Sequence, residues 1–426
     1  MKKVLIIGFL HPLTLSGGSF RTLPLASYLP EFGWEPVVLT PLLLEKRQLP
    51  FRVVETPYRD VLVFWKKLFG FKLDEDIKMQ VKNRFGTDSK TSVVDFFLTR
   101  AGEILNYPDS HRGWQRFALE AGNNLLEHEK IDAMISCHPT ISHIIASNLK
   151  AKHRIPWLAD FPDLWSQNHN YSYSSLRKAI DQRLEKKTLS TADVLTTVSE
   201  PWAEELRVLH KGKPVYTVTH GFDPLQVNIP PVKLTDKFTI TYTGTIYRGK
   251  QQPSRLFAAL RDLISDETID PVDVEVRFYG SKHDWLDKEI KQYGLSNIVK
   301  QHGVVPRQAA IIKQRESQLL LFLDWDDPQE KGVYTGKIYE YLGTRRPTLA
   351  TGGAADDVVA ELLNKTKAGK QAATVEDIKQ TLKNLYREYK LKGDLAYNSI
   401  DSEINKHSHR EMARKFSAIL DRLAPQ

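Results

Sequence analysis

The sequence predicts an α/β protein built from two doubly wound parallel sheets. Short apolar runs alternate with helical patterns along most of the chain, as is typical of parallel strands joined by crossover helices. Residues 228–231, which include two prolines, interrupt this alternation, and a second series begins at Phe238. A chain of 426 residues is long enough for about two domains. We therefore expect two halves, each with its own sheet.

The first half opens with a strand, helix and strand. Residues 4–10 are an apolar run that predicts a buried strand, and residues 20–29 have the spacing of an amphipathic helix that ends at Gly33. Residues 36–40 predict the second strand. Further strands are expected at 133–137, 157–160, 194–198 and 215–219, and further helices at 141–150 and 176–189. This order is that of a parallel sheet covered by helices.

The second half repeats the pattern. Its expected strands are 238–242, 274–279, 298–302, 319–323 and 347–350, and a short helix is expected at 337–342. The predicted division is 1–225 for the first domain, with an insertion at about 60–110, then 226–400 for the second and 401–426 for a returning helix. Ligands of such sheets bind outside the carboxyl ends of the strands, so we expect a site in the cleft between the halves.

Composition narrows the functional class. Sixty Lys and Arg residues against 52 Asp and Glu residues leave a net charge of +8, a mild excess that is weak evidence for a polyanionic partner. The one cysteine, Cys137, excludes an intramolecular disulfide and a cysteine-built zinc site, and it indicates a reducing compartment. His11 and Pro12 interrupt the apolar start, which argues against a signal peptide. We expect a cytoplasmic protein, or one on a membrane surface, with no nucleic-acid module.

Residues 60–100 do not follow the alternation. A short stretch there mixes aromatic side chains with lysines: Phe64, Trp65, Lys66, Lys67 and Phe69. That composition suits a lipid interface with anionic head groups, so these residues are candidates for contact with a membrane or a lipid acceptor. The alternative is an insertion whose aromatic residues pack on its own domain while the lysines face solvent.

Two glycine-bearing turns are candidate phosphate sites. Gly17 and Gly18 follow the first strand and lead into a helix, where backbone N–H groups and the helix N-terminus favour an anion, although such a turn can also be only a turn. Arg248 and Lys250 flank Gly249 at the carboxyl end of the strand 238–242. Their position favours diphosphate binding over a solvated turn. Neither turn has the spacing of a dinucleotide or Walker motif.

A third segment, residues 332–343, predicts a glycine-bearing turn followed by a helix. Glu340 is an acid among apolar and aromatic neighbours, so its carboxylate needs a partner. Ribose hydroxyls and a structural arginine would serve equally well.

These three segments, in this order, resemble the retaining glycosyltransferases of the GT-B fold, specifically glycosyltransferase family 4. The resemblance spans nearly the whole chain. Supporting it are residues 192–200, the run His220-Gly221-Phe222-Asp223 where the family usually has Asn-Gly-Phe-Asp, the run Tyr107-Pro108-Asp109 with Trp114, and a final helix at 410–423. The fold it implies is α/β, with two Rossmann-like doubly wound domains facing a central cleft and a C-terminal helix that crosses back to the first domain.

The resemblance also implies roles for particular residues on the donor side. Gly17 and Gly18 fall on the loop that faces the donor diphosphate, and Lys250 falls on the basic residue that contacts it. Arg248 is an adjacent candidate. The family usually has an arginine a few residues before the lysine, and in this sequence Thr245, or a residue close to it, stands at that position. Glu340 matches the second of two family glutamates, the one that holds the donor ribose.

The first family glutamate would fall at Gly332, which carries no carboxylate. Glu330 lies two residues earlier, and a shift of the loop could bring it near that position. The backbone N–H groups of Gly332, Val333 and Tyr334 remain candidates for cradling phosphate.

On the acceptor side, His138 ends a strand, where it can bind a sugar hydroxyl, transfer a proton, or only cap a helix. Asp160 and Asp163 resemble a family segment at the cleft floor, and either could orient the acceptor or pair with Arg248. Residues 324–326 (Asp-Trp-Asp) superficially match a metal motif of another glycosyltransferase fold, but the GT-B resemblance implies no obligatory metal or other cofactor.

The function implied is transfer of a sugar, with retention, from a UDP- or GDP-type nucleotide diphosphate sugar to a hydroxyl acceptor. Cell-surface polysaccharide or glycolipid assembly and a peripheral position on the inner face of the cytoplasmic membrane are the expected setting. The alternatives are a nucleotide-sugar epimerase or phosphorylase on the same scaffold, and a catalytically reduced module that binds a glycan or a partner, which Gly332 favours.

Overall fold

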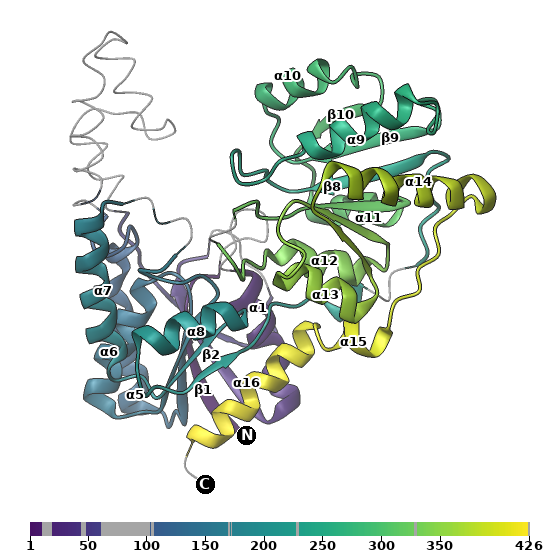
Figure 1. Ribbon diagram of the computed structural model, residues 1–426. Coiled ribbons are helices and arrows are strands. Elements are labelled where there is room, and N and C mark those ends of the chain that lie inside the picture. Colours follow the sequence, from purple (N-terminus) through teal and green to yellow (C-terminus); the bar gives the residue numbers. More distant parts are fainter. Residues whose placement is uncertain are drawn as a thin grey trace. The chain divides into compact units, whose positions relative to one another are not determined.

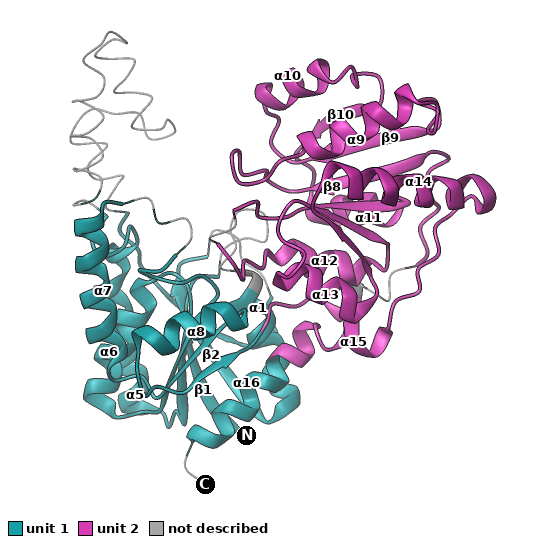
Figure 2. Ribbon diagram, in the orientation of Figure 1, with its two compact units in different colours: residues 1–218, 413–426 teal, residues 219–412 magenta. Residues whose placement is uncertain are grey.

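The computed structural model of the chain comprises two compact units. Unit 1 is made of residues 1–218 and 413–426, and unit 2 of residues 219–412 (Figure 2). The structure describes residues 1–10, 19–43, 48–60, 103, 106–168, 171, 173–226, 230–327 and 330–424.

Unit 1 is built on a parallel sheet of seven strands in the order β3-β2-β1-β4-β5-β6-β7. The strands are β1 (Lys2–Ile7), β2 (Trp34–Pro41), β3 (Arg52–Thr56), β4 (Ala133–Ser136), β5 (Trp157–Phe161), β6 (Val194–Thr197) and β7 (Val215–Thr217). The strand order reverses between β1 and β4, so the carboxyl ends of these two strands border the crevice where such sheets bind ligands.

Helices cover this sheet (Figure 1). They are α1 (Ser19–Tyr28), α5 (Gln115–His128), α6 (Ile141–His153), α7 (Ser175–Leu189), α8 (Glu200–Leu209) and α16 (His409–Leu423), with short 3-10 turns at Leu29–Phe32 and Arg112–Trp114. Most of α16 belongs to unit 1, which includes residues 413–426. The indole of Trp34, on β2, donates a hydrogen bond to Asp421 on this helix (3.1 Å). The last helix of the chain thus packs beside the first strands.

A buried ion pair crosses the core of unit 1. The guanidinium of Arg21, on α1, donates through Nε and Nη2 to the Asp160 carboxylate on β5, at 2.6 and 2.9 Å, and both side chains are fully buried. Nη2 also donates to the Val218 carbonyl (2.7 Å), and Thr196 on β6 donates to Asp160 (2.7 Å). The Arg21 guanidinium lies over the ring of Phe416 on α16. One charge pair therefore fastens two helices to two strands.

Unit 2 contains a parallel sheet of six strands in the order β10-β9-β8-β11-β12-β13. The strands are β8 (Phe238–Thr243), β9 (Val274–Tyr279), β10 (Val299–Gly303), β11 (Leu319–Leu323), β12 (Thr348–Thr351) and β13 (Gly369–Ala372). The helices are α9 (Ser254–Ser265), α10 (Asp284–Gln292), α11 (Arg307–Arg315), α12 (Gly336–Thr344), α13 (Val358–Thr366), α14 (Val375–Lys392) and α15 (Asp401–Asn405), with a 3-10 turn at Pro224–Gln226. The order reverses between β8 and β11.

Strand β8 presents two different faces. Phe238, Ile240 and Tyr242 belong to the apolar core beneath α9 and α14. Alternate threonines face α11 and the residues after it, because side chains of a strand alternate between faces. Thr239 binds Gln318 through its amide (2.9 Å), and Thr241 accepts a hydrogen bond from Ser317 (2.7 Å).

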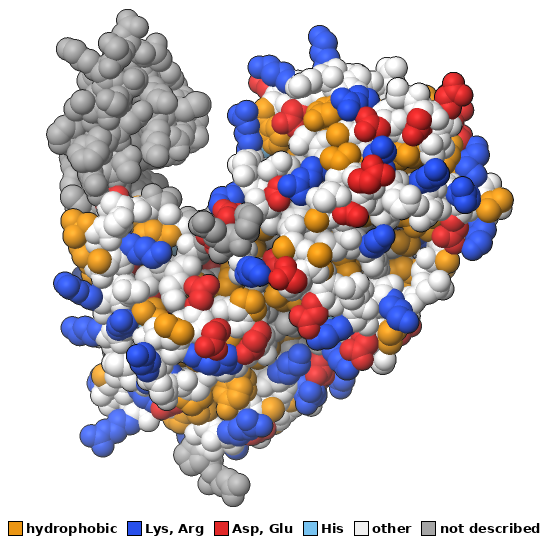
Figure 3. Space-filling view, in the orientation of Figure 1, with side chains coloured by type: hydrophobic (Ala, Val, Ile, Leu, Met, Phe, Trp, Pro, Cys, Tyr) orange, Lys and Arg blue, Asp and Glu red, His pale blue; other side chains and the backbone are white. Residues whose placement is uncertain are grey.

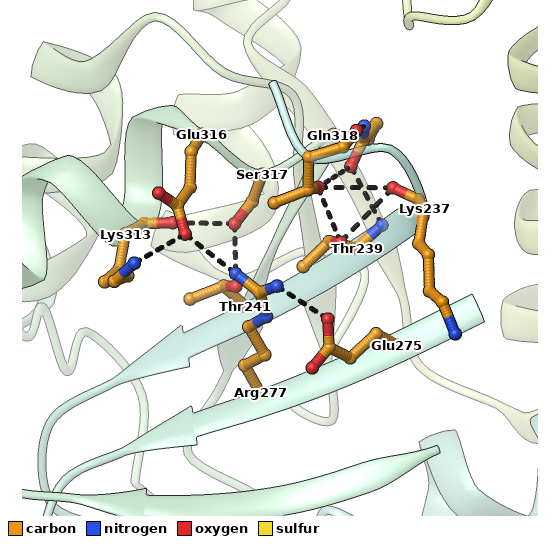
Figure 4. Close-up of polar contacts among 10 residues, drawn as sticks. Lys237, Thr239, Thr241, Glu275, Arg277, Lys313, Glu316, Ser317 and Gln318 are labelled. Carbon is orange, nitrogen blue, oxygen red and sulfur yellow. Dashed lines mark hydrogen bonds and ion pairs between the residues drawn. The ribbon is translucent and has the colours of Figure 1, made fainter. Parts of the chain in front are cut away.

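A charged network continues this seam (Figure 4). Arg277 on β9 pairs with Glu275 on the same strand (2.6 Å) and with Glu316 just after α11 (2.7 Å). Lys313 on α11 also pairs with Glu316 (2.9 Å). Together these bonds hold α11 against β8 and β9.

The predicted fold class is confirmed: both halves are parallel, Rossmann-like sheets with helices. The strands β9 and β11 have the bounds that the sequence predicts, and the other predicted strands agree within a few residues. Two strands, β3 and β13, were not predicted. Both are edge strands, with a partner on one side only, and their half-exposed residues lack the continuous apolar run of an internal strand.

We predict that replacing Arg21 by Met destabilises unit 1 by about 3–5 kcal/mol, because the carboxylate of Asp160 would stay buried without its cation. Urea unfolding followed by tryptophan fluorescence measures the change. The matched control is Arg207→Met, which removes a partly exposed ion pair with Glu200 and should cost less than about 1 kcal/mol. Equal losses in the two variants would contradict a dominant role for the buried pair.

Candidate functional site

The carboxyl end of β8 lies at the strand-order reversal of unit 2. Gly244 follows the strand with φ of +110°, a backbone conformation that glycine adopts without strain. A side chain here would also crowd Lys337, because a Cβ on Gly244 would lie 3.0 Å from Cε and 3.2 Å from Nζ of that lysine. The glycine therefore leaves room for a lysine at the end of the strand.

Lys337 lies in the first turn of α12 and reaches back to β8. Its ammonium donates to the hydroxyl of Tyr242 and lies 3.9 Å from the centre of that ring. Burial lowers the pKa of Lys337 to about 7, and Glu340 offsets this lowering only in part. A cation in the first turn of a helix faces the positive end of the helix dipole, so an anion bound here would stabilise the charged form.

Glu340 is one turn further along α12. Its Oε1 accepts a hydrogen bond from Gln314 Nε2 (2.6 Å), and its Oε2 lies 3.3 Å from a guanidinium nitrogen of Arg307. Gln314 is fully buried and also donates to the hydroxyl of Thr243, the last residue of β8 (2.8 Å). Two residues of α11 thus hold the carboxylate beside the end of β8.

Lys250 and Arg248 extend in different directions from the loop after β8. The ammonium of Lys250 pairs with Asp327, which follows β11 (2.5 Å), and lies 5.9 Å from the ring centre of Trp325. The exposed guanidinium of Arg248 lies 5.6 Å from the ring centre of Trp285 on α10. The loops after β8 and β11 therefore meet around Lys250, whereas Arg248 faces α10.

The segment before α12 is held by Asp357. Gly332 has φ of +84°, and its N–H donates to the Asp357 carboxylate (3.1 Å). A phosphate at the Gly332 amide would have to compete with this bond. Val333 is buried, and the hydroxyl of Tyr334 donates to the Val358 carbonyl (2.9 Å).

The Asp-Trp-Asp run at 324–326 does not gather into one cluster. Asp324 is buried and accepts from the Trp325 amide (2.8 Å), and burial raises its pKa to about 7. Asp326 pairs with Arg255 (2.8 Å). Within the described ranges, no group of three or more His, Cys, Asp or Glu side chains could hold a metal ion.

In unit 1, His138 is exposed just after β4, at the carboxyl edge of the sheet. A second histidine, His111, lies near it. Burial lowers the pKa of His111, Asp109 opposes this lowering, and the positive charge of His138 adds to it. The hydroxyl of Tyr58 is 3.3 Å from Nδ1 of His111, and the ring of Phe9, at the end of β1, packs on the same imidazole.

The run 107–109 supports this edge. Asp109 accepts from the His111 amide (2.7 Å) and from the Ile141 amide at the start of α6 (3.1 Å). The carboxylate therefore takes the place of a side-chain cap on α6, which follows His138.

The two aspartates after and within β5 have different environments. Asp163 is exposed beyond the carboxyl end of the strand. Asp160 is fully buried with Arg21, so the expectation that it could pair with Arg248 or orient an acceptor is wrong. A buried arginine on α1, which the sequence pattern did not reveal as its partner, already satisfies this carboxylate.

Some predicted residues lie outside the described part of the chain. These are Gly17 and Gly18, and the aromatic and lysine residues Phe64, Trp65, Lys66, Lys67 and Phe69.

Lys337, Gln314 and His111 are the residues that sequence reasoning missed. The pair Gly336-Lys337 gave no specific signal, because Gly212-Lys213, Gly249-Lys250 and Gly369-Lys370 are the same pair. Which lysine reaches the end of β8 depends on how α12 packs. Among the helices that the structure describes, none is both long and apolar enough to cross a bilayer.

Comparison with known proteins agrees with this architecture. Residues 16–220 match the family model of the glycosyl transferase 4-like domain. No curated protein sequence matches the chain significantly.

Solved structures resemble the whole chain. HepE of Anabaena, solved in complex with UDP, is 13% identical with a TM-score of 0.61, covering 99% of this chain and 100% of its own. Sucrose-phosphate synthase from Thermosynechococcus elongatus is 11% identical with a TM-score of 0.62, covering 99% of both chains. UDP-GlcNAc 2-epimerase from Methanocaldococcus jannaschii is 11% identical with a TM-score of 0.51, covering 99% of this chain and 100% of its own. At these identities the likeness establishes the fold, so the chain has the GT-B fold, and its residues 16–220 match a glycosyl transferase 4-like domain.

Proposed function

We propose that this protein is a retaining glycosyltransferase that moves a sugar from a UDP- or GDP-type nucleotide diphosphate sugar to a hydroxyl acceptor. The observation that carries the proposal is that Lys337 and Glu340, one turn apart on α12, both lie beside the carboxyl end of β8. A cation at a helix start suits a diphosphate, and a carboxylate one turn away suits the hydroxyls of a ribose.

Unit 2 holds the donor in this proposal. Lys337 and the N-terminus of α12 bind the diphosphate, and Lys250 and Arg248 add positive charge from the loop after β8. The amides of Val333 and Tyr334 contribute hydrogen-bond donors to the diphosphate, and the amide of Gly332 does so if it exchanges its bond to Asp357.

The ribose is bound by Glu340. Its carboxylate, held by Gln314 and Arg307, accepts hydrogen bonds from the ribose hydroxyls. The presence of UDP in the HepE structure agrees with a nucleotide donor. Gly17 and Gly18 are proposed to face the diphosphate from unit 1.

The chemistry is positional and electrostatic. The acceptor oxygen bonds to the anomeric carbon while the bond from that carbon to the diphosphate oxygen breaks. A donor phosphate oxygen on the same face takes the acceptor proton, so that the configuration is retained without a protein nucleophile. The cations of unit 2 stabilise the charge that develops on the departing diphosphate.

Unit 1 holds the acceptor. His138 binds an acceptor hydroxyl or assists its proton transfer, and Asp163 orients the sugar; both are exposed at the carboxyl edge of the sheet. We propose assembly of a cell-surface polysaccharide or glycolipid as the setting, at the inner face of the cytoplasmic membrane. The aromatic and lysine stretch that contains Phe64 supports a lipid acceptor by its composition.

A nucleotide-sugar epimerase is the second candidate. The likeness to UDP-GlcNAc 2-epimerase favours it, and so does Gly332, which supplies no carboxylate to a donor sugar. The same glycine also favours a reduced module that binds a glycan or a partner.

Replacing Lys337 by Met should weaken binding of UDP-sugars or GDP-sugars by about ten- to a hundred-fold, because one charged hydrogen bond to phosphate is lost. Lys250→Met should also weaken binding, since it removes a positive charge from the loop after β8, where the diphosphate is proposed to bind. Isothermal titration calorimetry measures both. Lys365→Met, which removes an exposed lysine on α13, is the matched control and should bind as the wild type does. Wild-type affinity in Lys337→Met would remove this lysine from the donor site.

Donor affinity should fall as pH rises above 7. In the free protein Lys337 has a pKa of about 7 and is mostly uncharged at pH 8, whereas a bound diphosphate favours the ammonium and raises its pKa. The complex therefore takes up a proton, and calorimetry in buffers of different ionisation enthalpy detects this uptake. We expect no such uptake in Lys337→Met. The same proton uptake in the variant would assign it to another group.

A panel of nucleotide sugars, screened by thermal shift and followed by product analysis with and without acceptors, tests the function. Transfer to an acceptor is expected, and a changed donor sugar without acceptor would indicate epimerisation instead. Failure to bind any nucleotide diphosphate would leave only the reduced module.

His138→Ala should slow transfer by about a hundred-fold or more if the imidazole moves a proton, with donor affinity unchanged. An unaltered transfer rate in His138→Ala would exclude that residue.

A further inference from the structure

The buried side of helix α7 is mostly polar. Arg177, Asp181, Glu185 and Thr188 are buried against unit 1, and Leu189, the last residue of the helix, is buried with them. Its outer side exposes Leu176, with 70% of its surface accessible, and Ile180, with 40%. A helix on a folded domain normally buries its apolar side chains and exposes its charges, so this pattern calls for a reason.

The inner side is fully engaged. Arg177 donates to Asp181 (2.8 Å) and to carbonyls of the segment before α5, and lies between the rings of Tyr107 and Tyr173. Asp181 also accepts from the hydroxyl of Tyr171.

Glu185, the other acid of α7, is equally engaged. It accepts from the Ser166 amide (3.0 Å) and lies 3.2 Å from His210. Both acids of α7 therefore lie inside, and the helix is held so that its outer side cannot turn inward.

The outer side has one row of four side chains along the helix axis. Leu176, Ile180, Arg183 and Lys187 follow one another at intervals of four, three and four residues, the spacing of neighbours on one face of a helix. Arg183 and Lys187 are exposed, and neither forms an ion pair within the described part of the chain. Lys186 is exposed next to the row. Because both acids are buried, this face carries only positive charge.

Figure 3 shows the same arrangement at the edge of unit 1 that α7 forms. Hydrophobic side chains lie near the start of the helix, and Lys and Arg side chains lie further along it. Since α7 follows β5, its start is at the carboxyl edge of the sheet, the edge that carries His138 and Asp163. The apolar end of the row is therefore the end nearer to the proposed acceptor residues.

We propose that this row of α7 docks on an anionic lipid surface. Leu176 and Ile180 would enter the interface, while the long side chains of Arg183 and Lys187 reach lipid phosphates. Two apolar side chains cover far too little area for a stable protein interface of about 800 Å² on each partner, whereas a few basic residues suffice for reversible attraction to acidic lipids. The inference deepens the membrane position proposed above and names the surface that produces it.

Vesicle co-sedimentation of the full chain tests the proposal, with phosphatidylcholine vesicles made with and without phosphatidylglycerol. The wild type should bind only the anionic vesicles, and binding should weaken as salt rises. Arg183→Glu with Lys187→Glu should reduce the partition coefficient by about twenty-five-fold or more, at about five-fold for each lost cation. Leu176→Ser with Ile180→Ser should also reduce it.

Lys288→Glu with Lys291→Glu is the matched control, because it reverses the same number of exposed charges on α10 of unit 2. This control should bind vesicles almost as well as the wild type. Thermal unfolding of every variant should match the wild type, since the changed side chains are exposed.

Three outcomes would overturn the proposal: no binding of the wild type to anionic vesicles, undiminished binding of the α7 variants, or an equal loss in the α10 control. Sugar transfer to a water-soluble acceptor, measured in parallel, should not change in the α7 variants. Loss of vesicle binding with intact transfer therefore tests the surface, and absence of transfer in the wild type tests the proposed function.

Discussion

The buried ion pair between Arg21 and Asp160 is the interaction on which unit 1 depends most. It joins α1 to β5. Thr196 connects it to β6, the carbonyl of Val218 connects it to the residue after β7, and the ring of Phe416 connects it to α16. A charge pair without access to water is stable only when each partner has its full set of hydrogen bonds, so these five elements must adopt their positions together. The position of α1 and the end of β5, which Asp163 follows, are thereby fixed.

In unit 2, hydrogen bonds between neutral groups join β8 to α11, next to the ion pairs of Arg277. Three alternate residues of β8, Thr239, Thr241 and Thr243, bind Gln318, Ser317 and Gln314 on or after α11. The last of these contacts continues to Glu340 on α12, so the strand, two helices and the carboxylate form one chain of hydrogen bonds. The opposite face of β8 is apolar and joins the main core of the unit. One strand therefore supplies both the packing and the positioning of the candidate donor site.

Helix α7 illustrates how a polar interior changes a surface. Its acids are engaged inside with Arg177, Tyr171, Ser166 and His210, so every charged side chain that the helix exposes is basic. Five basic and two acidic residues give α7 a net charge of +3. Both acids are buried together with only one of the cations, Arg177, so the exposed side carries the other four positive charges.

The two parallel sheets and most of their strands were predictable from the amino-acid sequence, because internal strands buried on both faces favour continuous apolar runs such as those at 4–7 and 319–323. The edge strands β3 and β13 escaped prediction, since strands with one open side need no such run. The segments that carry Lys250 and Glu340 were also recognisable, because glycine turns next to strand ends have a local signature. Three contacts could be seen only in the folded chain: Lys337 reaches Tyr242, 95 residues earlier in the chain, Gln314 holds Glu340, and Asp160 pairs with Arg21, 139 residues away. A side chain's partner depends on which strands are neighbours and which face a helix buries, and neither is encoded in the residues beside it.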